Sequence, residues 1–74
     1  MMRSARYLLA VVDHASFTRA AAALNISQPA LSQQVRQLED SLGATLLDRT
    51  GRRIAPTDVG RAYIHHLRMA LHNI

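Results

Sequence analysis

The 74-residue sequence predicts a mainly α-helical fold, in which three helices are followed by a short two-stranded hairpin and a final helix. Three observations support this fold class. Apolar residues recur at spacings of three and four along most of the chain, which is the period of an amphipathic helix. Residues that cap helices interrupt this pattern at short intervals. Between Gly43 and Pro56 the helical period is lost, and glycine among arginines indicates a tight, basic turn.

The first two helices are bounded by residues that cap or end helices. Apolar residues at helical spacing, among them Leu8 and Val11, predict a first helix over residues 3–14. Ser16 is a favourable N-cap for a second helix over residues 17–24. This second helix contains a run of alanines, which favours helix formation and allows another helix to approach closely.

The third helix is predicted over residues 28–42. Asn25 tolerates the left-handed conformation that ends a helix, Ser27 is a favourable N-cap, and Gly43 is a favourable stop. Because only residues 25–27 separate the second and third helices, the two are expected to cross steeply, as in a helix-turn-helix.

The two faces of the third helix differ in polarity. One stripe is apolar and is expected to face the core, and it consists of Leu31, Val35, Leu38 and Leu42. The opposite face is polar, basic near its start and acidic further along, and it contains Pro29, Ser32, Gln33, Arg36 and Asp40.

The stretch "TLLDRTGRRIAP" predicts a small hairpin with strands over residues 45–48 and 53–55. Thr50 and Gly51 are expected at its tip. The arginines around the tip make this a short basic wing.

The final helix is predicted to begin after Thr57, which serves as its cap, and to continue to the end of the sequence. Its apolar side chains share one stripe, formed by Val59, Tyr63, His66, Leu67, Ala70 and Ile74. So small a domain offers little surface to cover this stripe, which indicates a partner helix.

The composition limits the possible functions. The formal net charge is +4, and all nine basic residues other than histidine are arginine, which binds phosphate and guanine well. On composition alone, a bias in genomic base composition explains the use of arginine without lysine equally well. Without cysteine there is neither a disulfide framework nor a thiolate metal site. The apolar runs are too short for a membrane span or a signal peptide, so a soluble cytoplasmic protein is expected.

The stretch "SQPALSQQ" at the start of the third helix has two interpretations. Pro29 can serve only to begin the helix, because the first amides of a helix have no intrahelical partner to lose. Alternatively, the first turn reads DNA bases from the major groove. Gln28 and Gln33 each offer a donor and an acceptor to an adenine edge, and Pro29 and Ala30 can contact a thymine methyl. The steep helix pair and the basic wing favour this second interpretation.

Three stretches, "SFTRAA", "SQPALSQQVRQLEDSLGATLLDR" and "PTDVG", follow one another in an order and spacing that resemble the N-terminal DNA-binding domain of the LysR-type transcriptional regulators of bacteria. The resemblance covers nearly the whole chain and implies a winged helix-turn-helix followed by a linker helix. It also implies a homodimer joined through antiparallel linker helices, tetramers in full-length proteins, and an inverted-repeat site in double-stranded promoter DNA.

The resemblance assigns roles to individual residues. The base-reading positions are Gln28, Pro29, Ala30, Ser32 and Gln33. The wing residues at the minor groove are Arg52 and Arg53. The positions expected at backbone phosphates are Thr18, Ser27, Arg36, Arg49 and Thr57.

The sequence departs from the family pattern in three respects. Many members have arginine where Gln33 stands, which favours an adenine or water-mediated contact over a guanine contact there. The family usually has glycine where Ala15 stands, and alanine costs up to about 1 kcal/mol if that position is left-handed. Residues 1–56 are expected to form the DNA-binding domain and residues 57–74 a truncated linker helix. The family's effector-binding domain is expected to be absent from this sequence, and any small-molecule effector is expected to act only through that missing domain.

Other function classes have less support. A helical protein-interaction module with an acidic partner remains the alternative, because the apolar stripe of the final helix suits it equally. His65, His66 and His72 suggest a metal site, but adjacent histidines point to different faces of a helix and no carboxylate lies one turn away. No serine, histidine and carboxylate form a recognisable catalytic arrangement. No catalytic residue, cofactor or metal is therefore predicted.

Overall fold

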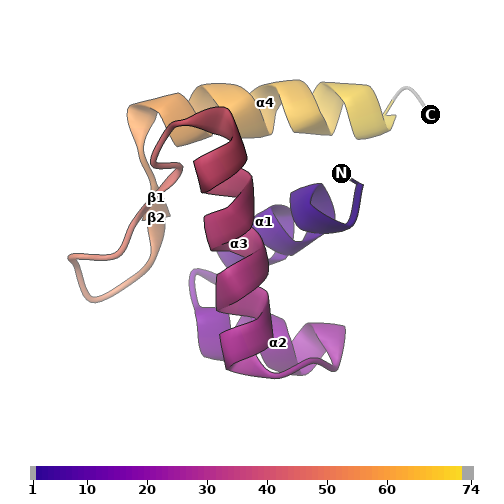
Figure 1. Cartoon of the computed structure of the whole chain (residues 1–74), viewed down its shortest axis with the longest axis vertical. Helices are drawn as coiled ribbons and strands as arrows, with labels where there is room; N and C mark the ends of the chain where they lie inside the picture. Colours follow the sequence, from indigo (N-terminus) through magenta and orange to yellow (C-terminus); the bar gives the residue numbers. More distant parts are fainter. Residues whose placement is uncertain (1, 73–74) are drawn as a thin grey trace.

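The computed structural model describes residues 2–72, which form four helices and one two-stranded antiparallel sheet. Along the chain these elements are α1 (Met2–His14), α2 (Phe17–Leu24), α3 (Gln28–Leu42), β1 (Leu47–Asp48), β2 (Ala55–Pro56) and α4 (Asp58–His72). In Figure 1, α3 extends from α2 at one end of the molecule to α4 at the other, α1 lies behind α3, and the loop between the strands projects to one side. The predicted fold class is confirmed.

The predicted boundaries of α2 and α3 are also confirmed, because both helices begin at the serines expected to cap them. The Ser16 hydroxyl accepts a hydrogen bond from the Arg19 N–H at 3.1 Å, and the Ser27 hydroxyl accepts one from the Ala30 N–H at 3.2 Å. Each serine thus satisfies an amide that has no partner within its helix.

The first three helices end in the same way, each with one residue in the left-handed conformation. These residues are Ala15 (φ 53°), Asn25 (φ 59°) and Gly43 (φ 65°). In each case the N–H of the left-handed residue and that of the following residue donate to carbonyls of the last helical turn, at 3.0–3.3 Å. This double hydrogen bond is the Schellman motif, and glycine or asparagine is its usual left-handed residue. Alanine at the first of the three sites is the unusual choice.

The core lies where α1, α2 and α3 meet and continues into β1 and α4. Its fully or nearly buried members are Leu8, Val11, Phe17, Ala20, Ala21, Leu31, Val35, Leu38, Leu46, Leu47 and Ile64. The predicted core position of Leu42 is wrong, because that side chain is 44% exposed. Leu38 is the last buried residue of the α3 stripe, and after the turn at Gly43 the core is continued by Leu46 and Leu47 instead.

The hairpin is shorter than predicted. Only Leu47 pairs with Pro56 and Asp48 with Ala55, so the expected strand positions of Thr45, Leu46, Arg53 and Ile54 are wrong. The backbone before β1 is already occupied. The Thr45 carbonyl accepts from the Thr57 hydroxyl at 2.6 Å, and the Leu46 carbonyl accepts from the Thr57 N–H at 3.0 Å. Arg53 lies instead in the loop over residues 49–54, called the wing loop below.

The start of α4 is fixed against the same segment of backbone. The Thr57 hydroxyl accepts a hydrogen bond from the Gly60 N–H at 2.9 Å, which confirms the predicted cap. Gly60 itself is buried against Leu46, and a Cβ at this position would collide with the Leu46 carbonyl oxygen. The ion pair between Arg68 and Asp13, at 2.8 Å, connects the other half of α4 to α1. None of the helices between residues 2 and 72 has the length and apolar character needed to cross a bilayer.

Candidate nucleic-acid interface

The polar face of α3 forms an open concavity at the surface. It is lined by Gln28, Pro29, Ser32, Gln33, Arg36, Gln37 and Asp40. Gln28, Gln33 and Arg36 are exposed, and none of their side chains makes a hydrogen bond to another part of the described chain. Donors and acceptors at the start of α3 are therefore available to an external partner.

Local sequence explains why the first turn of α3 is exposed. Leu31 and Val35 point into the core, which turns the opposite side of the helix outward. Pro29 occupies the first turn, where it removes no intrahelical hydrogen bond. Gln28 is already helical although it precedes a proline, because the Ser27 cap fixes the start of the helix. Ala30 is exposed as well but lies beside the concavity rather than in its lining.

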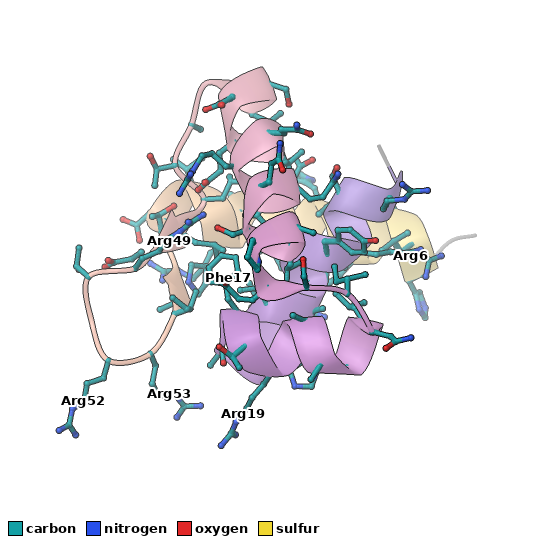
Figure 2. All side chains as sticks on the ribbon, turned by 60° about the horizontal axis from the view of Figure 1, so that its bottom comes forward. Arg6, Phe17, Arg19, Arg49, Arg52 and Arg53 are labelled. Atoms are coloured by element: carbon teal, nitrogen blue, oxygen red, sulfur yellow. The ribbon has the colours of Figure 1, made fainter. Side chains whose placement is uncertain are left out.

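The wing loop carries Arg52 and Arg53, which are both exposed. Figure 2 shows these two side chains pointing to the same side of the molecule as Arg19 of α2. Arg19 and Arg53 line a second open concavity together with His14, Ala15 and Ser16. Sequence reasoning did not single out Arg19, which the structure places beside Arg53. The available signal was that Arg19 is the only charged side chain in α2.

The arginines fall into two groups according to their partners. Arg49, Arg61 and Arg68 form ion pairs with Glu39, Asp58 and Asp13. Within residues 2–72 the others form none, and they are Arg3, Arg6, Arg19, Arg36, Arg52 and Arg53. The side chains at the polar face of α3 and on the wing loop thus carry positive charge that the described chain does not neutralise. Such charge is available to phosphate.

Two of the residues predicted at phosphates, Arg49 and Thr57, also have internal partners. The Arg49 guanidinium lies 3.2 Å from the Glu39 carboxylate and is centred 4.7 Å from the centre of the Phe17 ring. Thr57 is occupied as the cap of α4. Thr18 and Arg36 are exposed, and Ser27 is exposed while it caps α3, so these three remain accessible.

Asp48 stabilises the beginning of the wing loop. Its carboxylate accepts hydrogen bonds from the Thr50 hydroxyl at 2.6 Å and from the Thr50 N–H at 2.9 Å. These bonds favour the ionised carboxylate and lower the pKa of Asp48 below its ordinary 3.8, the hydroxyl having the larger effect.

The apolar stripe predicted for a partner helix is placed differently from the prediction. Tyr63 and Leu67 are half-buried and pack against the core of their own domain, because the contact of Gly60 with Leu46 turns that side of α4 inward. The exposed stripe contains Val59, Ala62, His66, Met69 and Ala70, with Val59 55% and Met69 53% exposed. Ile74, the last predicted member, lies outside the described residues.

Three comparisons place this architecture among known proteins. A family model described as "Bacterial regulatory helix-turn-helix protein, lysR family" matches residues 2–61. The HTH-type transcriptional regulator AlsR of Bacillus subtilis (strain 168) is 45% identical over 73 residues, which is 99% of this chain and 24% of AlsR. The RuBisCO operon transcriptional regulator of Allochromatium vinosum is 48% identical over 67 residues, or 90% of this chain and 22% of that protein.

Solved structures agree with these matches. The BenM DBD in complex with catB site 1 DNA superposes with a TM-score of 0.95 at 41% identity, covering 99% of this chain and 78% of that one. The CbnR DBD in complex with DNA gives a TM-score of 0.90 at 35% identity, covering 97% of this chain and 83% of that one. The chain spans about a quarter of the length of the curated relatives it matches (24% and 22%). From its sequence, its fold and the geometry of this interface, the chain belongs to the lysR family of bacterial regulatory helix-turn-helix proteins.

Proposed function

We propose that this chain binds double-stranded promoter DNA in a sequence-specific manner, as the DNA-binding domain of a cytoplasmic transcriptional regulator and not as an enzyme. The observation that carries the proposal is the polar face of α3, exposed and without internal partners, beside a wing loop on which Arg52 and Arg53 form no ion pair among the described residues. A helix of this kind fits the major groove, where base edges are read by side chains of its first turns. The similar BenM and CbnR structures are complexes with DNA, which supports the same ligand here.

The proposed contacts follow the geometry of the interface. Side chains at the start of α3 read base edges, and they are Gln28, Pro29, Ala30, Ser32 and Gln33. Arg52 and Arg53 of the wing loop enter the minor groove. Backbone phosphates are bound by Thr18, Ser27 and Arg36, together with Arg19, which shares a concavity with Arg53.

The proposed assembly is a homodimer formed through α4, with residues 1–56 as the DNA-binding domain and residues 57–74 as the linker. Two copies would bind the halves of an inverted repeat, and full-length proteins would form tetramers. The exposed apolar stripe of α4 supports this dimer. A charge at position 62 is expected to weaken the dimer without unfolding the domain, because Ala62 is exposed. Sedimentation of Ala62→Glu measures the effect. Ala23→Glu, at an exposed position of α2, serves as the matched control, and equal dimerisation of both variants would contradict the proposed interface.

Base reading is tested at Gln28. Duplexes are first selected from a random library with the wild-type chain. Gln28→Ala is then expected to cost about 1–3 kcal/mol on the selected duplex and little on random DNA. Gln34→Ala is the matched control, because Gln34 faces α1 and bonds to Ser4 at 3.4 Å. Equal losses on selected and random DNA would show that Gln28 does not read bases, and no binding at low salt would favour the protein-interaction alternative.

A further inference from the structure

We infer that Glu39 is a positioning residue, which holds the wing loop in the orientation that presents Arg52 to DNA. The inference rests on the proposed function and adds a residue that contacts no DNA itself. It follows from a chain of contacts that begins on α3, passes through the backbone before the wing loop, and ends on α2.

The first part of this chain is the Glu39 side chain, which is only 13% exposed. One carboxylate oxygen, Oε2, accepts hydrogen bonds from the Leu46 N–H at 2.7 Å and the Leu47 N–H at 3.2 Å. The other, Oε1, accepts from Nη2 of Arg49 at 3.2 Å. A single carboxylate of α3 thus binds both the backbone that enters β1 and the first residue of the wing loop. Hydrogen bonds to an ionised group are stronger and shorter than neutral ones.

The second part of this series of contacts is the Arg49 guanidinium, which connects Glu39 to α2. It stacks on the Phe17 ring with 4.7 Å to the ring centre, and Phe17 is buried at the first position of α2. The Arg49 side chain is 30% exposed, so this ion pair is less screened by solvent than a surface pair. The base of the wing loop is therefore fixed to both helices of the helix-turn-helix. Figure 2 shows Arg49 beside Phe17, with Arg52 extending from the far part of the loop.

The other polar contacts of the wing loop do not join it to α3, although Ile54 at its end packs against the core. The sheet has only two residues in each strand, and an isolated pair of strands is marginal in water. The Asp48 and Thr50 hydrogen bonds lie within the loop itself. The Ile54 N–H donates to the Ala15 carbonyl at 3.4 Å, which joins the far end of the loop to α1 but not to α3. Glu39 is thus the described side chain whose polar contacts tie the start of the loop directly to the helix proposed to read bases.

Glutamine at position 39 separates these contacts. Its one amide oxygen can accept from the Leu46 and Leu47 amides, but its NH₂ group then meets the Arg49 guanidinium, which is also a donor. Glu39→Gln is therefore expected to retain the backbone contacts and release Arg49. Once Arg49 is released, the wing loop is expected to become more mobile, and Arg52 is no longer held in one position.

A double-mutant cycle measures this positioning through DNA affinity. Dissociation constants on the selected duplex are compared for wild type, Glu39→Gln, Arg52→Ala and the double variant. Arg52→Ala is expected to weaken binding about tenfold in the wild-type chain and less than about threefold in the Glu39→Gln chain. A purely structural effect of Glu39→Gln would lower the folded fraction equally with and without Arg52, and would leave the two ratios the same. Tenfold losses in both backgrounds would overturn the inference.

The matched control is Asp40→Asn, which removes a carboxylate one residue further along α3. Asp40 is exposed and forms no ion pair among the described residues, so its cycle with Arg52 is expected to be additive. If Glu39→Gln does not fold, as judged by circular dichroism, Arg49→Gln replaces it, because this change leaves the bonds from Glu39 to the Leu46 and Leu47 amides in place.

Amide relaxation in the free protein provides a measurement that needs no DNA. Fast motion of residues 50–53 is expected to increase in Glu39→Gln and in Arg49→Gln, and to stay unchanged in Asp40→Asn. If the loop amides remain equally ordered in all three variants, the inference fails even if DNA binding is found. If no duplex is selected but the loop loses its order in the variants, the proposed function fails. Glu39 then orders the wing loop but positions Arg52 for no DNA.

Discussion

Replacing Ala15 by glycine is expected to stabilise the domain, although it removes a methyl group. Ala15 ends α1 with φ 53°, in the left-handed region. Before the opposing terms below are subtracted, this backbone conformation costs an L-residue about 1–2 kcal/mol, whereas glycine adopts it freely. Two terms oppose the gain: the greater freedom of glycine in the unfolded chain, about 0.4–1 kcal/mol, and the loss of a half-buried methyl, about 0.3 kcal/mol. The net expectation is a gain of about 0.5 kcal/mol.

Thermal and urea unfolding of Ala15→Gly measure this gain. For a domain of this size, about 0.5 kcal/mol corresponds to a rise in Tm of about 2–4 °C. Protein concentration must be equal for all variants, because dimerisation makes Tm depend on it. The helix is expected to end at the same residue, since the Ala15 and Ser16 amides donate to the Val12 and Val11 carbonyls at 3.2 and 3.3 Å.

The chain provides two controls for the same substitution type. Ala23→Gly, at an exposed position inside α2, is expected to lose about 0.5–1 kcal/mol, because glycine weakens a helix interior. Asn25→Gly is expected to change little, since asparagine already tolerates its φ of 59°. The explanation by backbone strain would be refuted if Ala15→Gly lost as much stability as Ala23→Gly.

Three further substitutions have definite expected results. Gly60→Ala is expected to lower the free energy of unfolding in urea by about 3 kcal/mol or more, because its Cβ would collide with backbone. The control is Gly51→Ala, whose Cβ would meet only an atom at 3.8 Å, and it is expected to stay within about 0.5 kcal/mol of wild type. Arg19→Ala is expected to weaken binding to selected and random DNA alike, and to reduce the slope of log affinity against log salt concentration by about 0.9. Figure 2 shows Arg6 on another side of the molecule, so Arg6→Ala is expected to leave this slope unchanged. Thr50→Val is expected to raise the pKa of the β1 aspartate toward 3.8 in an NMR titration, since it removes the larger of the two causes that lower it. Because folding lowers the pKa of Asp48, the hydrogen bonds that its ionised carboxylate accepts stabilise the wing loop fully above pH 3.8. This stabilisation is lost as the pH falls through the lowered pKa.

The helix boundaries were predictable because their determinants are local. Ser16, Ser27 and Gly43 each act within one turn of their own position, so the sequence around them contains the information needed. The exposure of Gln28 and Gln33 was predictable for a similar reason, because the apolar stripe of α3 fixes the opposite face. Their contacts with bases stay predictions.

The errors arose where distant parts of the chain compete for the same groups. Strand patterning assigned Leu46 to the hairpin, but Glu39 and Thr57 bind its amide and carbonyl. The stripe of α4 was chosen by its apolar residues alone, and periodicity does not tell which edge of such a stripe packs on its own domain. The internal contacts of Arg49 with Glu39 and Phe17 could not be predicted from its charge, and its role at phosphate stays a prediction.

At the start of α4, main-chain atoms of the helix and of the segment before β1 are in direct contact. The Leu46 carbonyl accepts from the Thr57 N–H and lies against Gly60, where no side chain intervenes. If two copies pair through α4, as proposed, the angle at this contact sets the distance between the two reading helices. Substitutions on the surface of α3 then alter which bases are preferred but leave that distance unchanged. In such a dimer, the bases preferred in a half-site and the spacing between half-sites would be set by different parts of the domain.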